Sequence, residues 1–174
     1  MELKGREIRV SVRNLVEFIF REGDIVSAGS GAPNTEAMQM GNKIHKKIQR
    51  SMGPGYEPEV SLFAMQEMRS REYGSEFLLK IEGRADGIFR EKDRVMIDEI
   101  KGVYMDIGEL KEPVFVHKAQ AMCYAFMVAE EEELSELEVQ VTYCNMETER
   151  IRRFCETFHR EELTEWFHDL IGRY

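Results

Sequence analysis

The segment Val95–Lys101 (VMIDEIK) constrains the fold more than any other part of the sequence. Its nearly continuous apolar content is typical of a central strand that is covered on both faces of its sheet. Successive side chains of a strand point to opposite faces, so Glu99 and Lys101 share one face while Asp98 and Ile100 share the other. A chain with this strand needs a layer of structure on each side of the sheet, and it brings a carboxylate and an ammonium group together on one side.

Hydrophobic periodicity along the rest of the chain predicts helices and strands that would form these layers. The 174 residues, 43% of them hydrophobic, suit one globular domain over 1–174. Small and turn-forming residues over Ser27–Thr35 predict a loop. The expected helices are Val12–Arg21, Glu36–Met52, Glu112–Glu133 and Glu161–Ile171, and the expected strands are Glu57–Met65, Glu76–Phe89, Arg94–Lys101, Leu137–Cys144 and Arg150–Phe158. We therefore expect an α/β or α+β fold with a central mixed β-sheet flanked by helices.

Several classes of protein are excluded by what the sequence lacks. It has neither a GxxxxGK[ST] phosphate loop nor a GxGxxG turn, so it carries no ATP motor and no dinucleotide-binding signature of its own. It also has no long uncharged apolar run and no signal-peptide core at its N-terminus, so we expect a cytoplasmic protein without a membrane partner. A net charge of -9 argues against a general nucleic-acid coat, so any contact with DNA must be local.

One local candidate for such a contact is a basic cluster on the second expected helix. It consists of Lys43, Lys46, Lys47 and Arg50. The simpler interpretation of four such charges is a solvated helix face.

The three cysteines do not form a recognisable framework. Cys123, Cys144 and Cys155 are odd in number, widely spaced and flanked by apolar or aromatic residues, so they fit neither a set of disulfides nor a CxxC metal site. We expect three buried free thiols.

A second carboxylate is expected beside Glu99 and Lys101. If the charged turn at Arg90–Asp93 closes a hairpin, Asp86 at the end of the preceding strand lies next to Glu99. Mg²⁺ commonly binds one or two protein carboxylates and keeps positions for water and phosphate oxygens. A nearby lysine can orient or deprotonate a metal-bound water, although a structural ion pair between Glu99 and Lys101 is the simpler alternative.

These residues resemble the PD-(D/E)XK nuclease superfamily, which has an Asp at the end of one strand and (Asp/Glu)-x-Lys on the next. Here the pattern is Asp86 followed by Glu99-Ile100-Lys101. The segment Gly83–Ile88 resembles the GxxD stretch of the RecB-like and Cas4-like branch of that superfamily.

Two further motifs resemble the same branch. Gly41–His45 (GNKIH) resembles its first motif, in which a helical histidine adds a metal ligand; on spacing alone, His45 would be a surface histidine. Gln120–Tyr124 (QAMCY) resembles its QxxxY motif, and His117 lies one turn earlier on the same helix face. Gln120 and Tyr124 would hold the substrate strand or position Lys101, or would be a surface amide and a core ring.

The resemblance implies a restriction-endonuclease-like core that holds Mg²⁺ or Mn²⁺. The implied ligands are His45, Asp86, Glu99 and the backbone carbonyl of Ile100, with Lys101 as the catalytic lysine. Substrate contacts would involve Gln120, Tyr124, Lys43 and Lys47, and the second-tier candidates are Glu59, Arg84 and His117. No iron–sulfur cluster is expected, because the branch members that hold one use four cysteines in a different arrangement.

The implied activity is a metal-dependent deoxyribonuclease, an exonuclease on single strands or DNA ends in repair or recombination. The sequence also resembles the N-terminal nuclease module of bacterial Rad3-like helicases, so a helicase domain or subunit is an expected partner. Two alternatives stay open: an inactive DNA-binding or scaffold module, and a metal enzyme that acts on a small phosphate compound.

Overall fold

The computed structural model describes residues 6–20 and 35–174, which contain four α-helices and six strands. The loop expected over Ser27–Thr35 lies outside this range except for Thr35. In chain order the elements are β1 (Arg6–Ser11), α1 (Val12–Phe20), α2 (Thr35–Ser51), β2 (Tyr56–Arg69), β3 (Glu76–Glu91), β4 (Arg94–Val103), a short 3-10 helix (Ile107–Glu109), α3 (Phe115–Glu131), β5 (Glu136–Asn145), β6 (Ile151–His159) and α4 (Arg160–Arg173).

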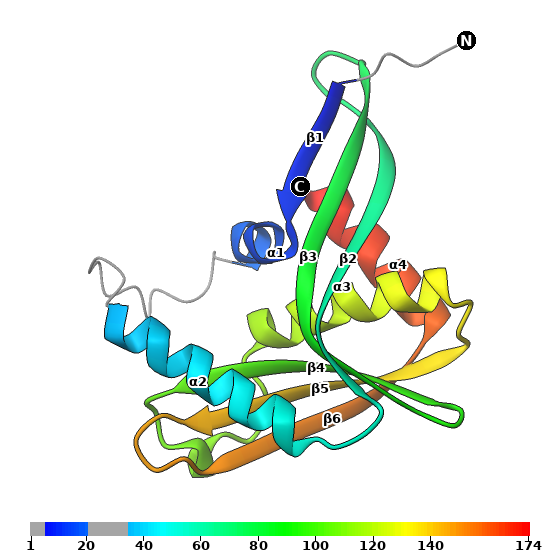
Figure 1. The fold of residues 1–174 in the computed structure, drawn as a ribbon. Coiled ribbons are helices and arrows are strands. Elements are labelled where there is room, and N and C mark those ends of the chain that lie inside the picture. The colour runs from blue at the N-terminus through cyan, green and yellow to red at the C-terminus, as the bar shows by residue number, and fades with distance from the viewer. Residues whose placement is uncertain (1–5, 21–34) are drawn as a thin grey trace.

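The six strands form one mixed sheet, as expected. Its order is β1-β3-β4-β5-β6, and β2 pairs with β3 outside this path. β1 runs parallel to β3 and β4 runs parallel to β5, whereas the β2–β3, β3–β4 and β5–β6 pairs are antiparallel. Figure 1 shows that β1, β2 and the first part of β3 stand up as an arm, while β4, β5 and β6 run across its base. The long strand β3 belongs to both parts.

Helices cover both faces of the base, as the apolar strand β4 requires. α3 is buried along most of its length, from Ala119 to Ala129, because it packs against the sheet and is itself covered by α1 and α4. The stacked rings of Phe126 and Phe167, with centroids 4.0 Å apart, join α3 to α4. α2 lies on the other face of the base (Figure 1). These layers confirm the expected sheet flanked by helices.

The observed elements differ from the expected ones by one or two residues at several ends, and by more than that in three places. β1 was not expected, because its sequence REIRVS is charged and its residues are mostly exposed. α3 begins at Phe115 rather than Glu112, since Pro113 and the extended Val114 precede it. β2 continues to Arg69, beyond the expected end at Met65, because it pairs with β3 as far as Glu76.

The three cysteines are free thiols, but only two of them are buried. Cys123 and Cys144 are buried, whereas Cys155 is exposed. The expectation for Cys155 was wrong because it lies on β6, the strand at the edge of the sheet. No helix within residues 6–20 and 35–174 is long and apolar enough to cross a membrane.

Candidate functional site

Asp86 lies where β3 passes from one partner strand to another. Pairing of β3 with β1 ends at Glu82, and pairing with β4 begins at Gly87. Between these points Oδ2 of Asp86 accepts a hydrogen bond from the backbone amide of Ile100, at 2.7 Å. The carboxylate therefore takes the place of a backbone acceptor at the fork between β3 and β4.

The regular alternation of β3 also breaks at this fork. Leu79, Ile81 and Ala85 point into the main hydrophobic core, as the alternation requires. Ile88 also belongs to that core, although it is three residues from Ala85. Asp86 lies within this change of direction, so the bend of the sheet itself turns its side chain toward β4.

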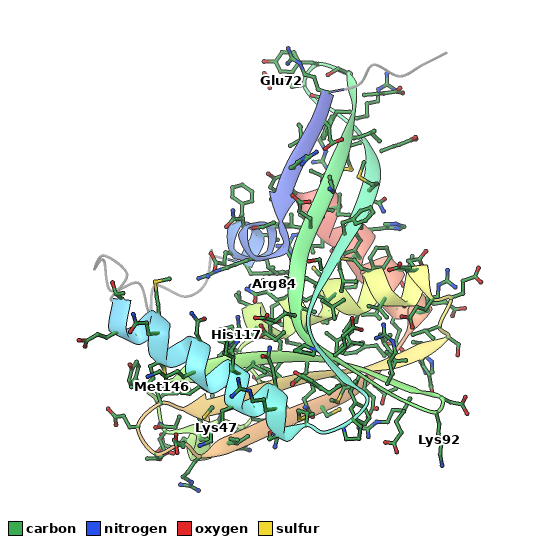
Figure 2. The ribbon with its side chains drawn as sticks, in the orientation of Figure 1. Lys47, Glu72, Arg84, Lys92, His117 and Met146 are labelled. Atoms are coloured by element: carbon green, nitrogen blue, oxygen red, sulfur yellow. The ribbon has the colours of Figure 1, made fainter. Side chains whose placement is uncertain are left out.

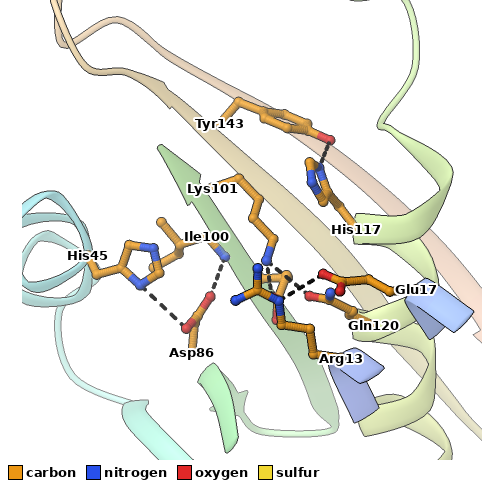
Figure 3. Close-up of polar contacts among 10 residues, drawn as sticks. Arg13, Glu17, His45, Asp86, Ile100, Lys101, His117, Gln120 and Tyr143 are labelled. Carbon is orange, nitrogen blue, oxygen red and sulfur yellow. Dashed lines mark hydrogen bonds and ion pairs between the residues drawn. The ribbon is translucent and has the colours of Figure 1, made fainter. Parts of the chain in front are cut away.

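On β4, Glu99 and Lys101 form the expected pair and are joined by a residue of α3. Nζ of Lys101 lies 2.9 Å from Oε1 of Glu99 and donates to Oε1 of Gln120 at 3.0 Å. Figure 3 shows Lys101 between the sheet and α3, where Gln120 reaches its ammonium group. The structure therefore confirms that Glu99, and not Asp98, is the partner of Lys101, and Gln120 positions the lysine.

Glu99 is the most unusual group of the site, because its carboxylate is almost completely buried. Its side chain is 7% exposed. Its Oε2 has no hydrogen-bond partner among the described residues. Burial raises the pKa of Glu99 above its usual range, against the opposing charge of Lys101. A buried polar oxygen without a partner is unfavourable, and the ion pair of Glu99 with Lys101 accounts for Oε1 only.

Helix α2 reaches Asp86 with two side chains. Nδ1 of His45 lies 3.4 Å from Oδ1 of Asp86, and Gln49 donates to the backbone carbonyl of Asp86 at 2.9 Å. The two residues are four apart, so they share one face of the helix. Burial acts to lower the pKa of His45, but its contact with Asp86 outweighs this effect and raises the pKa above its usual value. His45 as a direct metal ligand stays a prediction, because the structure pairs it with Asp86.

Tyr124 of α3 explains the glycine that precedes Asp86. A Cβ atom added to Gly83 would lie 2.5 Å from the Tyr124 hydroxyl, so only glycine leaves room for the ring. The ring is 6% exposed. Tyr124 therefore holds β3 against α3 immediately before the fork.

His117 has a structural partner. The hydroxyl of Tyr143 accepts the backbone amide of Val114 and lies 2.9 Å from Nδ1 of His117. The hydroxyl and Nδ1 share a hydrogen bond whose direction follows the tautomer of the imidazole. Burial lowers the pKa of His117 to about 4, and the charges of Lys101 and Arg13 act in the same direction.

A buried polar network lies on the face of β4 opposite Glu99. Asp98 is fully buried and accepts hydrogen bonds from Tyr56, Gln140 and Thr142. A Cβ atom at Gly87 would overlap the ring of Tyr56, so this second glycine of β3 also makes room for an aromatic residue. The network was not expected, because it depends on the register of β2, β3 and β5. Gln49, in contrast, is detectable from its spacing to His45.

The remaining predicted site residues lie at different distances from the fork. Arg84 is exposed and lies two positions before Asp86 (Figure 2). Glu59 is exposed, has a φ of 54° and lies between two residues of β2 that pair with Gly87 and Ala85, the neighbours of Asp86. Lys43 is exposed on α2, whereas Lys47 pairs with Glu149 of the β5–β6 turn at 3.2 Å.

The chemistry of the site fits a hard divalent cation. Asp86 and Glu99 supply two carboxylates, and the Ile100 carbonyl is a third oxygen, which together match the preference of Mg²⁺ or Mn²⁺. Within the described ranges, no three His, Cys, Asp or Glu side chains group around a common point. The donors that fit are therefore two side chains and a backbone oxygen, with the free Oε2 of Glu99 as the strongest indication.

Comparison with known proteins gives information on the fold and on nothing else. No protein-family model matches the chain, and no curated protein matches it in sequence. The chain is similar to a solved structure described as SSO0001, with a TM-score of 0.56 and 22% identity. The match covers 96% of this chain and 77% of that one. The protein therefore shares its arrangement of a mixed sheet and flanking helices with that structure.

Proposed function

We propose that this protein is a divalent-metal-dependent deoxyribonuclease that acts on single strands or DNA ends. The observation that carries the proposal is the convergence of two strands at one fork, where Asp86 and Glu99 offer carboxylate oxygens and Lys101 lies beside them. The buried and unpartnered oxygen of Glu99 supports it further, because a structural ion pair alone leaves that oxygen unexplained.

The residues of the site have separate tasks in the proposed hydrolysis. Mg²⁺ or Mn²⁺ held by Asp86, Glu99 and the Ile100 carbonyl would lower the pKa of a bound water and offset charge on the phosphate. Lys101 orients the attacking water and screens the phosphate with its positive charge.

Neighbouring side chains keep these groups in place. Gln120 keeps the ammonium of Lys101 directed toward Glu99 by accepting a hydrogen bond from it. His45 and Gln49 fix the carboxylate and the backbone of Asp86 from the opposite side.

The proposal is tested by incubating the protein with Mg²⁺ or Mn²⁺ and labelled single-stranded, linear duplex and circular DNA. Lys101→Ala is expected to reduce degradation by at least about 100-fold. Lys80→Ala is a matched control, because Lys80 is also a strand lysine paired with a glutamate two residues away, Glu82, at 3.0 Å. Its side chain is 23% exposed, against 25% for Lys101. The control variant should degrade DNA like the wild type.

Metal-dependent degradation that is equally fast in Lys101→Ala would overturn the mechanism. If the wild type binds DNA but degrades none with any metal, the protein is a binding module instead. Its net charge of -9 would then make the binding weak and sensitive to salt. Strong competition by a small phosphodiester, and none by long single-stranded DNA, would indicate a small phosphate substrate.

A further inference from the structure

An exposed arginine of α1 lies beside the site and outside the buried face of its helix. Arg13 is on the first turn of α1, and Figure 3 shows its guanidinium extending toward Lys101. The positive charges of Arg13 and Lys101 both act, after burial, to lower the pKa of His117. The arginine therefore adds to the positive potential on the α3 side of the fork.

The position of Arg13 is unfavourable for helix stability. Backbone amides at the start of a helix carry partial positive charge, so a cation in the first turn is repelled. The hydroxyl of Ser11 already accepts the amide of Asn14 at 3.1 Å, so the helix start has a cap without Arg13. The buried face of α1 consists of Val12, Leu15, Val16 and Ile19. Neither capping nor packing accounts for an arginine at this position.

The only contact described for Arg13 is weak and leaves most of its donors unused. Its Nε lies 2.8 Å from Oε1 of Glu17, one turn along α1. The two side chains are 75% and 45% exposed. A solvated pair of this kind contributes little to stability, so a phosphate group could displace Glu17 at small cost. The terminal nitrogens of the guanidinium match two oxygens of a phosphate.

We infer that Arg13 binds a backbone phosphate of the substrate strand next to the phosphate that is cleaved, and that Glu17 competes for the same guanidinium. The inference rests on the proposed function, since a phosphate subsite presupposes a nucleic-acid substrate. It adds α1 to the elements that hold the strand, and it places the strand on the side of Lys101 that faces α3.

The test measures binding without cleavage. A fluorescently labelled oligothymidylate is titrated with the full chain in Ca²⁺ over a series of salt concentrations, and anisotropy gives the affinity. Arg13→Ala should weaken binding about three- to tenfold at low salt and lower the slope of log affinity against log salt by about 0.7, the value for one phosphate contact on a single strand.

Two further variants make the test specific. Glu17→Gln should strengthen binding about two- to threefold in the wild-type background and have no effect in Arg13→Ala, because it acts by releasing Arg13. Arg9→Ala is the matched control, since Arg9 is also exposed and pairs with a nearby glutamate, Glu7, but on the arm. Its affinity should equal that of the wild type. The melting temperature of Arg13→Ala should not fall, which separates a lost contact from a damaged fold.

The outcomes separate this inference from the proposed function. If the wild type degrades DNA but Arg13→Ala and Glu17→Gln bind as the wild type does, the phosphate subsite is wrong and the nuclease stands. If the variants change binding as expected but the wild type degrades no DNA, the nuclease fails, and Arg13 is a phosphate contact of a binding module rather than of a cleavage site. A change in Arg9→Ala equal to that in Arg13→Ala would also overturn the inference, because it would show a general charge effect.

Discussion

At the scale of single residues, two glycines of β3 are explained by aromatic rings from other elements. The Tyr124 ring of α3 fills the space beside Gly83, and the Tyr56 ring of β2 fills the space beside Gly87. The two glycines lie on either side of Asp86. Gly83 and Tyr124, which belong to two motifs far apart in the sequence, are therefore in direct contact.

Gly83→Ala should destabilise the protein by about 1–3 kcal/mol, because the new methyl group displaces Tyr124. The free energy of unfolding in urea measures the effect. Gly41→Ala is the control, since Gly41 lies in α2 with no atom within 4 Å of an added Cβ. That variant should gain about 0.5–1 kcal/mol from reduced chain entropy. Equal stabilities of the two variants would show that the ring does not occupy the space.

His117 predicts a pH dependence of stability. Its pKa is about 4 in the folded protein and about 6.5 when unfolded. Between these values the unfolded state binds a proton that the folded state does not, so His117 causes stability to fall as the pH drops from about 6.5 toward 4.

The difference in unfolding free energy between the wild type and His117→Asn isolates this effect, because the asparagine side chain can hydrogen-bond to the Tyr143 hydroxyl but does not titrate. The variant should lose less stability than the wild type over that range. His159→Asn, at an exposed position on β6, should follow the wild type. Parallel curves for the wild type and His117→Asn would contradict the assignment of a neutral imidazole.

Contacts between residues that are close in the sequence were predictable from it, and contacts between distant residues were not. Strand alternation alone selected Glu99 over Asp98 as the partner of Lys101. The contact of Tyr56 with Asp98 joins positions 42 apart in the chain and depends on the register of three strands. The pairing of His45 with Asp86 depends on where α2 lies, which periodicity does not specify.

At the scale of elements, α2 is the α-helix with the fewest buried residues in the described part of the chain. Only Ile44 and Ile48 of its 17 residues are buried, in a small cluster with Ile100 and Cys144. Its other connections to the fork are the two polar contacts with Asp86. α3, in contrast, is buried along eleven consecutive residues.

Ile48→Ala should therefore loosen α2 without unfolding the rest. We expect amide exchange over residues 35–51 to accelerate by about tenfold or more, while exchange in β4 and β5 stays near that of the wild type. Hydrogen–deuterium exchange mass spectrometry resolves these segments.

Ile97→Ala is the comparison, because Ile97 is fully buried in the main core. It should cost about 2–5 kcal/mol and accelerate exchange in the sheet as well. Uniform acceleration in both variants would show that α2 unfolds only with the whole molecule.

Periodicity predicted all four helices and five of the six strands. The strand that it missed, β1, is charged at three of its six positions and is stabilised by parallel pairing with β3 rather than by burial. The bend that separates the arm from the base was also not predictable, because it arises where β3 changes partners at Asp86. The sheet is mixed partly because α3 is a long crossover helix, which allows β4 and β5 to run parallel.

At the scale of the whole molecule, the net charge of -9 opposes the approach of a polyanion. Asp86 and Glu99 add local repulsion at the very place where a phosphate would bind. A divalent cation would reverse the sign of this local field. Binding of DNA should therefore depend on the cation even when no bond is cleaved.

Removal of divalent cations by EDTA, at constant ionic strength, should weaken oligothymidylate binding by at least about tenfold. The double variant Asp86→Asn with Glu99→Gln should bind about equally with EDTA and with Ca²⁺, because its site has no charge to neutralise. Fluorescence anisotropy measures both. A wild-type affinity that is the same with and without the cation would contradict a metal at this fork.

The hydrogen bond from the Ile100 amide to Asp86 has a consequence for how this fold would change over evolutionary time. The side chain of Asp86 accepts a backbone hydrogen bond between two strands and also serves the proposed chemistry. The side chain of Lys101 has no described hydrogen bond to the backbone. A descendant released from selection for catalysis would still be selected to fold. Homologues that lose the proposed activity are therefore expected to replace Lys101 first and to keep Asp86. An intact aspartate alone would then be a poor marker of an active homologue.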